Sequence, residues 1–180
     1  MTLPTFGGLP SSLALDRPDL LAPPVEALLR AWPHADQVVV VEIDPDLADT
    51  TALNETYSLD PADGANCVVV SGKRDGVERI AACLVRSDTR ADVNHVVKRT
   101  LDVRKLSFHP HERAVEETGM EHGGITPVGL PAGWRILIDT RVVDIEHTLI
   151  GSGVRRSKLL VPGQLLAQLP GAEVVAELAG

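Results

Sequence analysis

The sequence predicts a single α+β domain in which helices pack on a mixed β-sheet. Apolar runs typical of strands are interspersed with helical patterns without strict alternation, which disfavours a doubly wound fold. One tight hairpin is signalled at residues 72–76, GKRDG, between two such runs. The chain has 180 residues, of which 44% are hydrophobic, and this is enough for one well-formed core.

Strands are expected where β-branched and apolar residues run continuously or alternate with polar ones. The expected strands are residues 37–43, 65–71, 78–86, 104–108, 135–139, 148–152 and 157–161. Residues 37–43, 65–71, 78–86 and 135–139 are expected to share the mixed sheet. Residues 172–178 close the domain as a strand or a helix, and their periodicity leaves both open.

Helices are expected where a proline or a capping residue precedes apolar residues at helical spacing. The expected first residues or caps are Pro23, Asp49 or Thr50, Asp92, Pro110 and Pro162. Pro33 ends the first of these helices and Gly119 the fourth. Residues 1–17 are rich in proline and glycine, so we expect an extended N-terminal arm before a domain formed by residues 18–180.

Composition narrows the classes of function. Aromatic residues are only 3% and the net charge is −8, which argues against a general nucleic-acid binder, although a local basic pocket could still hold one nucleic-acid end. Cys67 and Cys83 lie in apolar runs and are expected to be buried, reduced thiols. No run of 18 apolar residues or secretory signal is present, so we expect a cytoplasmic protein that binds neither membranes nor DNA.

Residues 116–130, EETGMEHGGITPVGL, contain four glycines and a proline. Glycines allow close approach of a ligand to the backbone, and such a stiff loop with bare N–H groups suits a carbonyl or an oxyanion. A helix C-cap at Gly119 followed by an ordinary turn is the simpler interpretation, and local composition alone favours it.

Few other residues suggest chemistry. His109 and His111 would share a face on a strand but lack a third metal ligand, and His122 is either a solvated loop residue or a ligand contact. Ser152, between two glycines, either lines a pocket or belongs to a turn. The densest basic cluster, Arg155, Arg156 and Lys158, is either a solvated turn or a phosphate contact, for which we favour Arg155 or Arg156. Neither a metal nor a cofactor is expected.

Three segments together resemble the YbaK family, also called the prolyl-tRNA synthetase-associated editing domain. They are residues 104–131, RKLSFHPHERAVEETGMEHGGITPVGLP, residues 135–142, RILIDTRV, and residues 151–175, GSGVRRSKLLVPGQLLAQLPGAEVV. A helix, a glycine–proline loop, a strand ending in Asp139, a glycine-bearing strand and a proline-led helix come in the family's order. The resemblance implies a bent mixed sheet.

The resemblance also implies an activity, the hydrolysis of the ester of a mischarged aminoacyl-tRNA in trans, as part of translation fidelity. Its implied partners are the acceptor end of the transfer RNA and an aminoacyl-tRNA synthetase. In the family, backbone N–H groups of the loop hold the aminoacyl carbonyl, and water or the terminal hydroxyl of the transfer RNA completes the reaction. The implied site residues are Gly123, Gly124, Ile125, Thr126 and Pro127 in the loop, with Asp139, Ser152 and Gly153.

One position departs from the family's pattern. The family usually has a lysine on an early strand, and the resemblance places Asn66 there. Asparagine donates hydrogen bonds but carries no charge. The alternative hypothesis is therefore a catalytically inactive relative that uses the same pocket to bind a small molecule or a protein.

Overall fold

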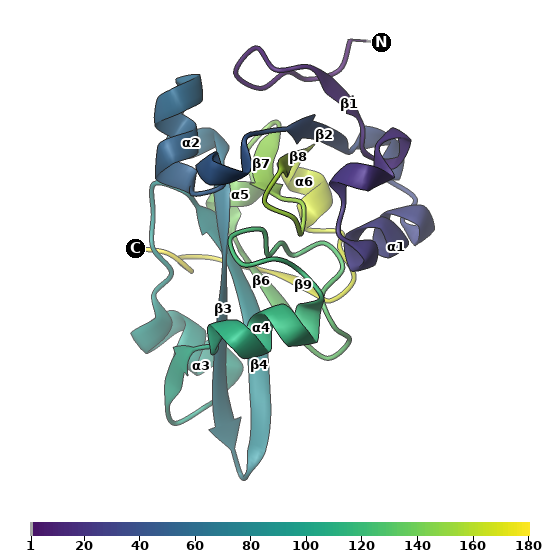
Figure 1. The fold of residues 1–180 in the computed structure, drawn as a ribbon. Coiled ribbons are helices and arrows are strands. Elements are labelled where there is room, and N and C mark those ends of the chain that lie inside the picture. The colour runs from purple at the N-terminus through teal and green to yellow at the C-terminus, as the bar shows by residue number, and fades with distance from the viewer. Residues whose placement is uncertain (1) are drawn as a thin grey trace.

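The computed structural model describes residues 2–180, which fold into two sheets covered by short helices (Figure 1). The strands are β1 Ser11–Leu13, β2 Val39–Glu42, β3 Ala65–Arg74, β4 Val77–Arg86, β5 Leu106–Phe108, β6 Arg135–Asp139, β7 Thr148–Gly151, β8 Ser157–Val161 and β9 Ala172–Val175. The α-helices are α1 Pro23–Ala31, α2 Thr50–Tyr57, α3 Lys98–Leu101, α4 His111–Thr118, α5 Thr140–Val143 and α6 Gly163–Leu166. A π-helical turn, Val93–Val97, leads into α3, and 3-10 turns occupy Ala14–Asp16, Pro18–Leu20, Ala35–Gln37, Pro45–Leu47 and Pro61–Asp63.

The first sheet is antiparallel and has the strand order β1-β2-β8-β7. Every residue of β8 is buried, including Lys158. Lys158 pairs with Val41 of β2 on one side and with Gly151 of β7 on the other. This register brings a lysine into the interior beside a glycine.

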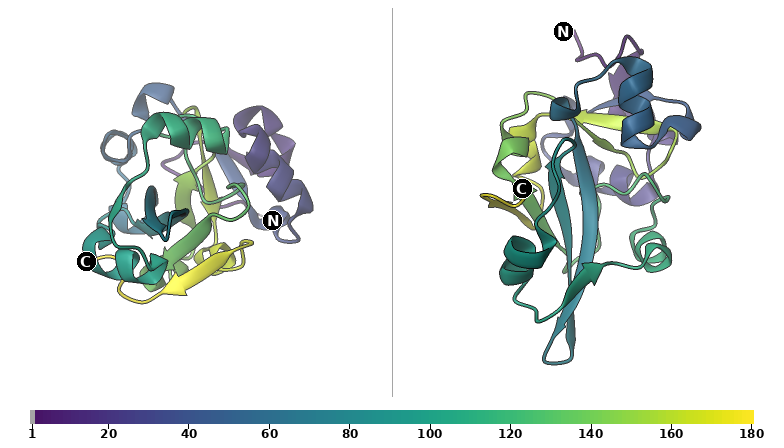
Figure 2. Two further views of the ribbon diagram at one scale, coloured as in Figure 1. Left: turned by 90° about the horizontal axis from the view of Figure 1, so that it is seen from below. Right: turned by 90° about the vertical axis from the view of Figure 1, so that its left-hand side faces the viewer.

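The second sheet is mixed and has the strand order β5-β3-β4-β6-β9. β3 and β4 form a long hairpin that turns at Asp75 and Gly76, both with positive φ, and its tip projects from the body of the molecule (Figure 2). β4 and β6 pair in parallel, as do β6 and β9. The two sheets meet at an isolated bridge between Gly64 and Leu149.

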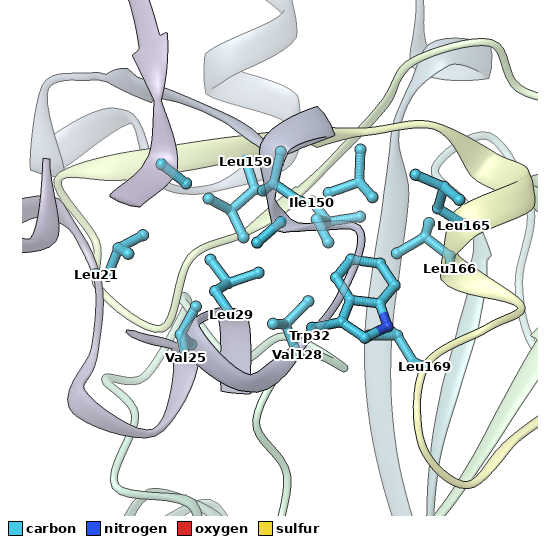
Figure 3. Packing of buried hydrophobic residues seen from close by; sticks show 14 of the residues in the cluster. Leu21, Val25, Leu29, Trp32, Val128, Ile150, Leu159, Leu165, Leu166 and Leu169 are labelled. Carbon is cyan, nitrogen blue, oxygen red and sulfur yellow. The ribbon is translucent and has the colours of Figure 1, made fainter. Parts of the chain in front are cut away.

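The largest core lies between the first sheet, the helices that cover it, and residues of β4 and β6 from the second sheet. Figure 3 shows apolar side chains from the α1 region facing those of the sheet and of the α6 region, among them Val25, Leu29, Trp32, Ile150, Leu159, Leu165 and Leu166. Smaller clusters lie under α3 and around α2. No helix in residues 2–180 has the length and apolar character needed to span a membrane.

Most expected elements are confirmed. Residues 135–139 and 157–161 are strands with the expected bounds, α4 ends at Gly119 with left-handed φ, and Asp92 caps the helical turn that follows it. The class, a single α+β domain with a mixed sheet and helices, is also confirmed by the structural comparisons reported below.

Three details of the expected fold are corrected. Residues 37–43 do not join the mixed sheet, because β2 pairs with β1 and β8 in the antiparallel sheet. The expected 72–76 turn is confined to Asp75 and Gly76, since residues 72–74 remain paired across the hairpin. Within the expected arm, residues 11–13 form β1 on β2, whereas Met1 lies outside the described residues. The open choice for residues 172–178 is resolved as a strand, β9.

Candidate functional site

A pocket of about 500 Å³ lies where the two sheets meet. It is lined by the N-terminal turn of α2, the first half of β3, the ends of β5 and β7, the start of α4, and Lys158 of β8. The loop after α4 contributes His122, Gly123 and Ile125. We call residues 123–127, GGITP, the glycine loop.

The glycine loop is fixed against the β7–β8 turn by its backbone. Gly124 donates its N–H to the Glu121 carbonyl at 2.9 Å and accepts a 2.8 Å hydrogen bond from the Gly153 N–H. A Cβ on Gly124 would lie 2.9 Å from the backbone nitrogen of Val154, which is too close for any side chain. Gly124 is therefore the contact point between the loop and the turn.

The loop can offer a ligand the N–H groups on either side of Gly124, because the N–H of Gly123, which lines the pocket, has no acceptor among the described residues. Ile125 lines the pocket, and the N–H groups of Ile125 and Thr126 have no acceptor within residues 2–180. The Thr126 hydroxyl is fully buried and also has no hydrogen-bond partner among those residues. Because buried donors are normally paired, these groups mark the loop as unusual. Pro127 follows, buried and outside the pocket lining.

Arg155 braces the loop and is not part of the pocket lining. Its guanidinium donates to the His122 carbonyl at 3.1 Å and to the Pro45 carbonyl at 3.1 Å, and its backbone N–H donates to Glu121 at 2.7 Å. These bonds tie the loop to the segment that precedes α2. A Cβ on Gly123, which has φ of +84°, would lie 2.6 Å from Nη1 of Arg155.

Asn66, on β3, lines the pocket. Its side-chain oxygen accepts a 2.8 Å hydrogen bond from the Thr50 hydroxyl, and both residues line the cavity. Thr50 is positioned by Asp49, which caps α2 through the N–H groups of Thr51 and Ala52. The Asn66 amide nitrogen has no acceptor in the described part of the chain.

Sequence reasoning missed Lys158 as a pocket residue. The side chain is 8% exposed, and Nζ donates to the Ala48 carbonyl at 3.2 Å. Burial, with a smaller contribution from the nearby Arg155 charge, lowers the pKa of Lys158 to about 8 against the opposing effect of Asp49. The available signal was a lysine inside the apolar run SKLLV, but the sequence alone cannot tell which face of β8 borders a cavity.

Three histidines and a cysteine complete the lining. His109 is 4% exposed and hydrogen-bonds Ser71 at 2.9 Å and Glu117 at 3.1 Å. His111 and His122 meet edge to face, with ring centroids 4.7 Å apart. Burial raises the pKa of the Cys67 thiol to about 12, so the thiol remains protonated and is a weak nucleophile at neutral pH.

Asp139, implied by the resemblance, and Arg156, predicted from the basic cluster, lie outside the pocket lining and have other partners. Asp139 caps α5, pairs with Arg141 at 3.0 Å, and accepts the Ala179 N–H at 2.9 Å. Burial disfavours its charged form, but these hydrogen bonds outweigh burial and lower its pKa below the usual value. Arg156 pairs with Asp19 at 3.2 Å.

The turn that contains Ser152 and Gly153 packs against the glycine loop and lies outside the pocket lining. The Ser152 hydroxyl hydrogen-bonds the Ser157 hydroxyl at 2.6 Å, which closes the turn. Gly153 has φ of +88°, and a Cβ there would lie 3.1 Å from Cγ2 of Val25 in α1. Of the two interpretations of Ser152, the structure supports the turn.

Comparisons with known proteins agree with this geometry. A family model described as an aminoacyl-tRNA editing domain matches residues 44–169, which include α2, β3, the glycine loop and Lys158. Among curated proteins, none matches this sequence.

Solved structures share the fold at low identity. A protein described as hypothetical has a TM-score of 0.74 at 18% identity, covering 87% of this chain and 99% of its own. A protein provisionally described as a trans-editing enzyme for prolyl tRNA synthetase has a TM-score of 0.72 at 20% identity, covering 86% of this chain and 94% of its own. A protein from Marinobacter aquaeolei VT8, provisionally described as a signal transduction protein, has a TM-score of 0.55 at 16% identity, covering 84% of this chain and 30% of its own.

Proposed function

This chain belongs to the aminoacyl-tRNA editing domain family, and from that premise we propose that it hydrolyses the ester bond of mischarged aminoacyl-tRNA in trans. The amino acid and the transfer RNA are separated by attack of water on the ester carbonyl. The protein acts in the cytoplasm, alongside the aminoacyl-tRNA synthetase whose errors it removes.

One observation carries the proposal: Gly123 and Ile125 of the glycine loop line the same pocket as Asn66. The cavity of about 500 Å³ is within the range of roughly 300–1,000 Å³ typical of small-molecule sites, so it suits the aminoacyl end of a transfer RNA rather than a whole duplex. Phe108, at 67% exposure, and the His111–His122 pair line it too and offer flat faces to the terminal base.

The chemistry follows from the donors in the pocket. The free N–H of Ile125 is available to the ester carbonyl, whose oxygen gains negative charge as water attacks. Cys67, the only thiol in the pocket lining, is held in its neutral form, so a covalent thioester route is disfavoured. Positioning and oxyanion stabilisation are the means of catalysis proposed for this site.

A deacylation screen tests the proposal. A panel of transfer RNAs, each carrying a labelled amino acid, is incubated with excess protein, and ester loss is compared with the spontaneous rate. Lys73→Met, on the exposed part of the β3–β4 hairpin, is the matched control and should behave as wild type. We expect at least one charged transfer RNA to be hydrolysed. Binding without hydrolysis of any member would instead support the inactive binding module.

A further inference from the structure

Lys158 is a buried cation without an acidic partner. No carboxylate of the described residues lies within 4 Å of its Nζ, and its one hydrogen bond is to the Ala48 carbonyl. An ammonium has three donors, so two have no protein acceptor among residues 2–180. Burying a charge without pairing it is costly, and proteins keep such groups mostly where a ligand uses them.

The position of Lys158 relates it to the glycine loop. Lys158 and Gly151 are directly paired across β8 and β7, so their side-chain positions face the same side of the sheet. A Cβ on Gly151 would lie 2.6 Å from the Gly124 carbonyl oxygen and 3.0 Å from that of Ile125. Lys158 therefore emerges on the sheet face that the glycine loop covers, and both line the pocket.

We propose that Lys158 is a catalytic residue whose ammonium group stabilises the negative charge that develops on the ester carbonyl oxygen, an inference that rests on the proposed function. Its burial favours the ester over the phosphates of the transfer RNA, because a charged phosphate would have to lose its hydration to reach a side chain that is 8% exposed. Lys158 of β8 thus supplies a positive charge to a pocket in which Asn66 is uncharged.

The reaction balances as follows. Water adds to the carbonyl carbon, and the π electron pair of the C=O bond moves onto the carbonyl oxygen, beside Lys158 and the Ile125 N–H. The pair then returns as the bond from carbon to the ribose oxygen breaks. The ribose oxygen takes one proton of the attacking water, and the other is released when the amino acid leaves as a carboxylate.

Other charged or titratable groups near Lys158 are few. Arg155 lies on the β7–β8 turn and Asp49 on the cap of α2, and both affect its pKa. From the remaining elements the pocket presents Cys67, His109, His111 and His122. With a pKa of about 8, the ammonium form predominates at neutral pH, and catalysis that needs it declines as the pH rises through about 8.

The main test separates kcat from KM. Wild type, Lys158→Met and the exposed control Lys73→Met are compared on the best substrate of the panel. We expect Lys158→Met to lower kcat by roughly 10²–10³-fold, with KM changed by less than about threefold, and Lys73→Met to change neither. Adding Asn66→Lys to Lys158→Met should recover part of kcat, because it returns a cation to the same pocket. Full kcat in Lys158→Met overturns the inference but leaves the proposed function intact.

Two further readouts distinguish this role from others. If Lys158→Met raises KM and weakens the salt dependence of binding while kcat is unchanged, Lys158 is a phosphate contact and the inference is wrong. A purely structural lysine would lower the melting temperature when removed, whereas we expect Lys158→Met to melt at or above the wild-type temperature, since a buried charge is gone.

The pH dependence of the rate supplies a further test. Taking the ratio of wild type to variant on the same substrate cancels the effect of titrating the substrate amine, which is common to both. The ratio of the wild-type to the Lys158→Met rate constant should fall as the pH rises through about 8. The pH range of about 6.5 to 9.5 extends more than one unit to each side of that pKa. A ratio that stays constant over this range overturns the inference. Wild type inactive on every charged transfer RNA would overturn the proposed function first and this inference with it.

Discussion

Gly124→Ala tests whether the position of the glycine loop controls catalysis. The added Cβ would meet Val154 N and C, each at 2.9 Å, and Gly153 C at 3.0 Å, all of them backbone atoms that cannot rotate away. Since ordinary contacts begin near 3.4 Å, the loop must move by about half an ångström. A hydrogen bond of about 2.9 Å from Ile125 to the ester oxygen would then be stretched or misaligned, and losing one such donor costs roughly 10²–10³ in rate.

The assay is single-turnover deacylation by wild type and Gly124→Ala, with thermal melting as the folding control. Overpacking costs about 1–3 kcal/mol, so the variant should melt a few degrees lower but remain folded at the assay temperature. Gly123→Ala should be milder in packing, because its Cβ meets only the guanidinium end of the Arg155 side chain and no backbone atom, although a φ of +84° strains any residue with a side chain. A folded Gly124→Ala that hydrolyses at the wild-type rate would refute the reasoning.

Three further predictions concern residues around the pocket. Arg155→Ala should lower kcat about tenfold, because it removes the hydrogen bonds that hold the loop. Arg156→Ala should leave both the rate and the salt dependence of tRNA binding unchanged, because the partner of Arg156 is Asp19. If Arg156→Ala instead makes the slope of log K against log[salt] less negative, by about 0.7 for one contact, Arg156 binds a phosphate. Asn66→Ala should cost less than Gly124→Ala, about tenfold or less, because the amide is neutral, and Asn66→Lys should keep or raise the deacylation rate. Asp139→Asn should lower the unfolding free energy by about 2 kcal/mol at pH 7 in denaturant melts. Because the folded-state pKa of Asp139 is depressed, this stabilisation is fully present above its unfolded pKa of about 3.9, declines below that pH, and is lost once the pH has fallen through the folded-state pKa. A difference at pH 2.5 equal to that at pH 7 would contradict the assignment.

Local patterns in the sequence predict much of the fold. Residues 135–139, RILID, and 157–161, SKLLV, each contain a short run of Ile, Leu or Val, and the structure has strands with those limits. α4 ends where Gly119 permits a left-handed φ that other residues adopt at a cost. Turn and cap chemistry is local, so it can be read without knowing the partners of a segment.

The pairing of strands could not be read in the same way. The segment 37–43 was expected in the mixed sheet, but its partner β8 lies more than a hundred residues later, and nothing in either apolar run specifies the other. Contacts across such sequence distances depend on the packing of the whole chain.

The same limit applies to the site. The glycine loop was predicted from the family's order of motifs, and Asn66 from its placement on an early strand; Asn66 lines the pocket together with Gly123 and Ile125 of the loop. Lys158 was not singled out, because its role depends on β7 and α2 closing around one face of β8. Asp139 and Ser152 look like site residues by type, but their hydrogen bonds are to nearby backbone and side-chain groups of the fold.

An NMR titration tests most directly the claim that this pocket receives the aminoacyl end and that the loop N–H groups bind its carbonyl. The ligand is a 3′-aminoacylamino analogue of adenosine, in which an amide replaces the ester and prevents hydrolysis. We predict that the amide signals of Ile125 and Thr126 shift downfield on binding, together with the side-chain amide of Asn66, while Asp75 at the hairpin tip does not change. Binding that leaves the glycine loop signals unmoved, or shifts confined to another surface, would contradict the account.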